Sequence, residues 1–201
     1  MNGEALDTRS KILQEAIDIV GLKGEFTIRE VAEKAGVNVA SINYYFGNKN
    51  SLLKEVEIYY SEILYKIQSE ILADNNLNAR DKLTSWAKSF IIFMFRSPAL
   101  LGLIVNILNE DKSYNPLLVQ RIYLNKELQS TIENLIKEST GIKNERVLNY
   151  KYLQIFSGIL GPVISKIVSS TFGDGESVFD INGKEDLDEY IEILISGVLA
   201  K

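Results

Sequence analysis

Residues 27–49, TIREVAEKAGVNVASINYYFGNK, hold two short helical stretches on either side of one glycine. Thr27, followed three residues later by Glu30, predicts a capping box in which each side chain bonds the backbone N–H of the other residue. Gly36 stands where the end of a helix needs a left-handed residue. Asn38 is a favoured N-cap for the helix that follows. The stretch therefore predicts a helix, a tight turn and a second helix.

These two helices, over 27–35 and 38–46, form a helix-turn-helix pattern. The short turn forces a close crossing, for which Ala32 supplies a small side chain. A helix before them, ended by Gly21 and Gly24, is expected to pack against a minimal core. The core consists of Ile28, Val31, Val37, Ile42 and Phe46.

The second helix has a buried side and an outward side when it is projected at about 100° per residue. The buried side carries Val39, Ile42 and Phe46. The outward side and its two flanks carry Ala40, Ser41, Asn43, Tyr44 and Tyr45. Small side chains allow close approach to a groove, and hydroxyls and an amide can donate to phosphates or base edges. We therefore predict that this helix enters the major groove of duplex DNA.

Net charge does not oppose this prediction, although the chain of 201 residues carries a formal charge of −5. Residues 1–54 have seven Lys or Arg and seven Asp or Glu, whereas the remaining residues have fifteen and twenty. Helix N-termini near Thr27, Asn38 and Asn48 can bind phosphate through free N–H groups, and Lys49 adds a cation. The first part of the chain is thus neutral and equipped for phosphate.

The stretch from Thr8 to Leu53 resembles the DNA-binding domain of the tetracycline-repressor (TetR) family. The resemblance implies phosphate contacts for Thr27, Tyr45 and Lys49. It implies base or backbone contacts for Arg29, Val39, Ala40, Ser41, Asn43 and Tyr44. The sequence departs from the family at Asn43, where tyrosine is usual, and at Val39, which is often polar.

The rest of the chain predicts further helices, so that the fold class is all-α with about nine helices. Expected helices cover 49–73, 78–96, 99–109, 116–140, 144–170 with an interruption or bend near Gly158 and Pro162, and 187–199. A Gly/Asp-rich loop is expected over 171–184. We assign residues 1–48 to a helix-turn-helix DNA-binding domain and residues 49–201 to a helical ligand-sensing and dimerisation domain.

The last two long helices are the predicted dimer platform, because both carry broad apolar stripes and the resemblance implies a four-helix interface. The earlier one carries Tyr152, Ile155, Phe156, Ile159, Leu160, Val163, Ile164, Ile167 and Val168. The later one carries Tyr190, Ile191, Leu194, Ile195 and Val198. About half of these residues are expected to be ordinary core. A homodimer would read two half-sites on DNA.

A cavity for a small, largely apolar effector is predicted where residues 86–95, WAKSFIIFMF, meet the apolar helix after them. Candidate ligand contacts are Trp86, Phe90, Phe93, Met94, Asn106, Asn109, Tyr114, Tyr123 and Phe156. Aromatic residues at helical spacing are commonly core, which is the alternative for each of them. Asn106 is a polar amide in an apolar helix and needs a partner.

The chain has no histidine and no cysteine, which excludes Ser-His-Asp and Cys-His catalysis and the common histidine-based metal sites. We expect no enzyme, no cofactor and no metal. We also expect no signal peptide, no membrane partner and a cytoplasmic location, since the apolar run Phe90–Phe95 is far shorter than the roughly 20 residues of a span.

The expected function is a homodimeric repressor that binds operator DNA and is released by its effector. An activator and a ligand-independent repressor remain open. So do a helical enzyme using carboxylates, around Glu110 and Asp111 or in the loop 174–186, and a helical interaction protein that does not bind DNA.

Overall fold

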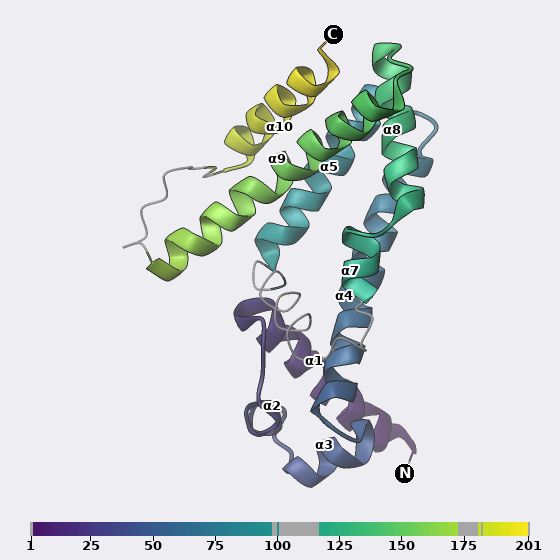
Figure 1. Ribbon diagram of the computed structural model, residues 1–201. Coiled ribbons are helices and arrows are strands. Elements are labelled where there is room, and N and C mark those ends of the chain that lie inside the picture. The colour runs from purple at the N-terminus through teal and green to yellow at the C-terminus, as the bar shows by residue number, and fades with distance from the viewer. Residues whose placement is uncertain (1, 98–99, 101–116, 173–180, 182, 201) are drawn as a thin grey trace. The chain divides into compact units, whose positions relative to one another are not determined.

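The computed structural model describes residues 2–97, 100, 117–172, 181 and 183–200. For residues 2–6 and 170–172 it describes the backbone only. Every regular element in the described part of the chain is a helix (Figure 1). The predicted all-α class is confirmed. The expected helix 99–109, apart from Leu100, and most of the loop 171–184 lie outside the described residues. The loop bounds are wrong at both ends, because residues 171 and 172 belong to one helix and residue 184 begins another.

The chain forms two compact units. The first contains Met1–Ile63 and Ser97–Tyr123, and the second contains Leu64–Arg96 and Leu124–Lys201. The first unit holds α1 (Asn2–Lys23), α2 (Ile28–Ala35), α3 (Val39–Phe46), the start of α4 (Lys49–Ala73) and α7 (Leu117–Ile122). The second holds the remainder of α4, α5 (Ala79–Arg96), α8 (Lys126–Thr140), α9 (Glu145–Phe172) and α10 (Lys184–Leu199). The helix α4 is therefore continuous across both sets of residues.

In the first unit, α1 contacts α2 and α3, and its buried side chains form the base of the core. That core consists of Ile12, Ala16, Ile19, Val20, Val31, Ala35, Ile42 and Phe46, all buried. The prediction that Gly21 helps to end α1 is wrong, because the helix continues to Lys23 and Gly24 ends it at φ 78°. Gly21 allows close packing instead: a Cβ there would lie 2.5 Å from Tyr60 Oη, so that the tyrosine would have to shift. That hydroxyl donates to the carbonyl of Ile17 at 2.9 Å.

In the second unit, α9 packs on α5, α8 and α10, and α10 packs on α5 (Figure 1). The expected single helix 116–140 is wrong, since it is divided into α7 and α8 by residues 123–125. Asn125 begins α8 by accepting the N–H of Leu128 at 3.0 Å. Of the expected interruption or bend near Gly158 and Pro162, the interruption is wrong, because α9 is an unbroken helix with Pro162 inside it, and the bend stays a prediction.

One side of α9 is exposed along its length and is largely apolar. Its members recur at spacings of three and four, with the polar Gln154 exposed beside them: Tyr150, Leu153, Ser157, Gly161, Ile164 and Val168. Leu153 is 55% exposed and Ile164 is 51% exposed, and Ile193 on α10 is 65% exposed. We call the six α9 residues together with Ile193 of α10 the α9–α10 stripe: Tyr150, Leu153, Ser157, Gly161, Ile164, Val168 and Ile193. The segment Glu145–Ser169 is long and apolar enough to cross a membrane by length and composition alone, with only 17% of its most apolar window buried.

Candidate nucleic-acid interface

The helix-turn-helix is held by the caps that the sequence predicts. Thr27 Oγ1 accepts the N–H of Glu30 at 3.1 Å. The hydrogen bond from Lys23 Nζ is the main cause that lowers the pKa of Glu30, and the backbone N–H of Thr27 lowers it further. The Thr27 half of the predicted capping box is therefore present, and the Glu30 carboxylate accepts a hydrogen bond from Lys23 Nζ at 2.5 Å.

The turn between α2 and α3 depends on Gly36, whose φ of 65° lies in the left-handed region. Its N–H donates to Glu33 O at 3.1 Å, and the N–H of Val37 donates to Ala32 O at 2.9 Å. Asn38 then begins α3, with Oδ1 accepting the N–H of Ser41 at 2.8 Å. These bonds fix the direction of α3 relative to α2 within the first unit.

The helix α3 presents an outward face of polar and aromatic side chains. Ile42 and Phe46 are buried, and Tyr44 is 82% exposed. The rings of Tyr44 and Tyr45 meet edge to face, with centroids 5.0 Å apart, so each ring restricts the other. Asn43 and Ala40 are exposed beside them. The outward face therefore carries small side chains at the beginning of α3, and an amide and aromatic rings towards its end.

Two residues of α3 lie differently from their expected projection. Val39, which the projection puts on the buried side, is 39% exposed in the first turn, where the core does not reach. Ser41 is half-buried, and its hydroxyl donates to Asn38 Oδ1 at 3.0 Å. This bond makes the Ser41 hydroxyl part of the cap.

The other candidate DNA contacts lie at neighbouring helix starts in the same unit. Thr27 and Arg29 are exposed at the beginning of α2, and Lys49 is exposed at the beginning of α4. Asn48 caps α4 by accepting the N–H of Ser51 at 2.9 Å. Since an N-cap side chain satisfies only one of the four free N–H groups of a helix, each start keeps donors for an anion. All nine predicted DNA contacts are thus in one unit, on or next to the helix-turn-helix.

Arg9 is a positioning residue that the sequence reading missed. Its Nη2 atom bonds Glu55 Oε1 and Oε2 at 2.5 and 2.6 Å. Its guanidinium carbon also lies 4.8 Å from the centroid of the Phe46 ring. Arg9 of α1 therefore connects the end of α3 to α4. The sequence could not predict the Arg9–Glu55 pair, because the two residues are 46 positions apart and helical periodicity relates only near neighbours in the chain.

We expect Arg9→Ala to lower the free energy of unfolding by about 1 kcal/mol, since the ion pair is partly exposed and the ring contact adds to it. Thermal unfolding measures this change. Arg29→Ala is the matched control, because Arg29 is exposed and its loss leaves the α1–α3–α4 connection intact. Equal melting temperatures for the two variants would contradict the positioning role.

The predicted effector contacts are only partly brought together. In the second unit, the ring centroids of Trp86 and Phe90 lie 6.0 Å apart, and those of Phe90 and Phe156 lie 6.1 Å apart. Phe93 and Met94 are buried on the same helix. Tyr123 belongs to the first unit and is 44% exposed.

Three further effector candidates, Asn106, Asn109 and Tyr114, lie outside the described residues. Glu110 and Asp111, the carboxylates of the enzyme alternative, lie there as well. Among the side chains that the structure does describe, no group of three or more acidic residues is placed to hold a metal ion.

Comparison with known proteins finds a family match and a similar regulator at the start of the chain. Residues 12–56 match the family model described as bacterial regulatory proteins, tetR family. The Bacillus subtilis (strain 168) protein named "Probable HTH-type transcriptional regulator YttP" is 38% identical over 72 residues, covering 33% of this chain and 35% of YttP. The matched stretch thus spans about a third of that relative's length.

The solved structures extend the likeness to the whole fold. HlyIIR, a hemolysin II transcriptional regulator, is 21% identical with a TM-score of 0.62, covering 98% of this chain and 99% of HlyIIR. The ketosteroid transcriptional regulator KstR2 of Mycobacterium tuberculosis is 14% identical with a TM-score of 0.65, covering 95% and 92%. At these identities the likeness concerns the fold alone.

Proposed function

Because the chain belongs to the tetR family of bacterial regulatory proteins, we propose that it regulates transcription by binding operator DNA through α3. The observation that carries the proposal is the outward face of α3, with Asn43 and Tyr44 exposed beside a half-buried Tyr45. Ile42 and Phe46, on the opposite side of α3, are buried in the core and hold this face rigidly. Rigid presentation is what direct reading of base edges requires.

Each proposed contact follows from its chemistry. Thr27, Tyr45 and Lys49 bind phosphates, through the free N–H groups of helix starts, a hydroxyl and an ammonium. Val39 and Ala40 contact apolar features such as thymine methyls, and Asn43 reads adenine or bonds a phosphate. The remaining proposed base or backbone contacts are Arg29, Ser41 and Tyr44.

The functional form we propose is a homodimer built on α9 and α10. The α9–α10 stripe is apolar and exposed in a single chain, and a second copy would cover it. Ser157 and Gly161 lie at its centre, and a Cβ at Gly161 would meet nothing within 4 Å of its own chain. Small residues at that position let a partner helix approach closely. Two copies would place two α3 helices roughly 34–36 Å apart, or a multiple of this, on the DNA.

The second unit is proposed to sense a small effector whose binding releases the DNA. Trp86 is 0% exposed, and among the described residues its Nε1–H has no hydrogen-bond partner. A buried donor of this kind is satisfied when an acceptor enters. Since α4 runs from the helix-turn-helix into the second unit, a tilt of α4 would change the half-site spacing. A coupling of about 1–3 kcal/mol is typical of such induction.

This proposal keeps the functional division at residue 48, with DNA binding before it and sensing and dimerisation after it. It also includes a cytoplasmic location and no catalytic activity. Activation in place of repression is the second candidate, since the same DNA contacts serve both.

The test is a mobility-shift titration of the intact protein with duplex DNA from its own promoter region and with a scrambled duplex. We expect binding to the promoter that is at least about a thousandfold tighter, and an affinity that falls steeply as salt rises. Equal affinity for the two duplexes would exclude the proposed function and leave a helical protein that does not read DNA.

A further inference from the structure

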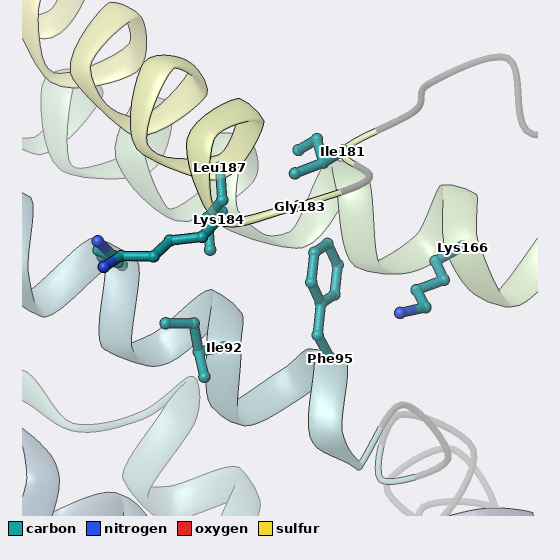
Figure 2. Close-up of a pocket in the computed structure, with 8 residues that line it drawn as sticks. Ile92, Phe95, Lys166, Ile181, Gly183, Lys184 and Leu187 are labelled. Carbon is teal, nitrogen blue, oxygen red and sulfur yellow. The ribbon is translucent and has the colours of Figure 1, made fainter.

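A cavity of about 510 Å³ lies within the second unit, where the end of α5 meets α9 and the start of α10 (Figure 2). Its size falls within the range of small-molecule sites. The lining includes Lys88, Ile92 and Phe95 of α5, Lys166 of α9, and Lys184 and Leu187 of α10. None of these residues belongs to the aromatic group around Trp86 and Phe156.

The charge of this cavity is opposite to that of the protein. All the charged residues that line it are lysines, in a chain whose net charge is −5. Lys88 forms an ion pair with Asp188, which compensates its charge. Lys166 and Lys184 are both exposed. The cavity therefore keeps positive charge for a ligand.

The beginning of α10 adds to this potential. Gly183 precedes the helix and provides no side-chain cap, so that the first N–H groups of α10 keep their capacity to donate. The positive end of the helix dipole favours an anion at this point. Glu185 and Asp186 in the first turn compete for the same dipole. The lysines are therefore the main source of attraction.

The other lining surface is apolar. Figure 2 shows the Phe95 ring standing between Lys166 on one side and Ile92 and Lys184 on the other. Lys166 Nζ lies 4.7 Å from the centroid of that ring, which holds the ammonium beside an apolar surface. Leu187 is buried and closes the cavity from α10. A cation next to an aromatic and aliphatic wall suits a molecule with one charged end and an apolar body.

We propose that this cavity binds an amphipathic anion, with its negative head at the lysines and its apolar tail against Phe95, Ile92 and Leu187. The binding does not require DNA and is separate from the effector proposed near Trp86; only a role of this cavity in releasing DNA would rest on the proposed function. A failure of DNA binding would therefore leave this site standing, and a failure of this site would leave the DNA-binding proposal standing.

The test uses dodecanoate below its micellar concentration as the probe, with the intact protein. Binding is measured by calorimetry and by the fluorescence of Trp86, the only tryptophan of the chain. Acetate supplies the charge without the tail, and dodecyltrimethylammonium supplies the tail with the opposite charge. We expect saturable binding of dodecanoate, and affinities at least about tenfold weaker for the other two.

Lys166→Gln and Lys184→Gln are each expected to weaken dodecanoate binding about three- to tenfold, because an exposed ion pair contributes modestly. Lys137→Gln is the matched control, since Lys137 is exposed on α8 and does not line the cavity. Phe95→Leu tests the tail contact without emptying the wall. Unchanged affinity in both cavity lysine variants, or equal binding of the oppositely charged probe, would overturn the proposal.

Discussion

Tyr45→Ala combined with Lys49→Ala is expected to weaken binding to promoter DNA by about a hundredfold or more. At each half-site the protein would lose the Tyr45 hydroxyl and the Lys49 ammonium, which we propose to bind phosphates. A dimer would lose both contacts at each of its two half-sites. The salt dependence is the sharper measurement. Removal of one lysine–phosphate contact per half-site is expected to reduce the slope of log affinity against log salt by about 2 in a dimer.

The matched control is Tyr65→Ala with Lys66→Ala, an exposed tyrosine and lysine adjacent in sequence further along α4. This control is expected to bind DNA as the unchanged protein does. Tyr45 is half-buried, so circular dichroism must first establish that the variant is folded. A folded Tyr45, Lys49 double variant with unchanged affinity and unchanged salt slope would remove both residues from the interface.

If the proposed homodimer forms through this stripe, Leu153→Glu combined with Ile164→Glu is expected to give a monomer and to abolish tight operator binding. Both positions lie in the α9–α10 stripe, and each substitution would occur twice in a two-fold interface. Burial of unpaired carboxylates against a partner is costly enough to raise the dimer dissociation constant about a thousandfold or more. Analytical ultracentrifugation measures the mass, and the mobility shift measures the DNA affinity.

Leu124→Glu is the control for this experiment, because Leu124 is 58% exposed in the same unit and lies outside the stripe. It is expected to leave the dimer intact. Flotation with lipid vesicles tests the membrane alternative that the composition of α9 raises. If the wild-type protein were monomeric and floated with the vesicles, the dimer proposal would be contradicted and the stripe would be a lipid-binding surface.

The helix-turn-helix could be predicted from the sequence because its signals are local. Thr27, Gly36 and Asn38 act within four residues of their own positions, and the structure confirms all three as cap or turn residues. Gly21 was misread because its role depends on Tyr60, which is 39 positions away in the chain. Arg9 was missed for the same reason. Local rules recognise an end or a turn, but they do not show which distant side chain fills a space.

The stripe on α9 could be predicted only in part. The sequence identified Ile164 and Val168 but grouped them with Ile155 and Ile159, which are buried. It left out Leu153, which is exposed. A largely apolar helix shows no clear polar side from which its inner and outer faces could be assigned, so composition could not separate the core residues from the exposed ones.

The close approach of Gly21 to the Tyr60 hydroxyl limits which pairs of side chains these two positions can carry. A side chain at position 21 would require the Tyr60 hydroxyl to shift, or a residue without that hydroxyl at position 60. Relatives that share this packing are therefore expected to keep glycine with tyrosine, or to change both positions together. Such a correlated pair would mark the sub-lineage in which α1 and α4 are joined in this way, independently of what each member binds.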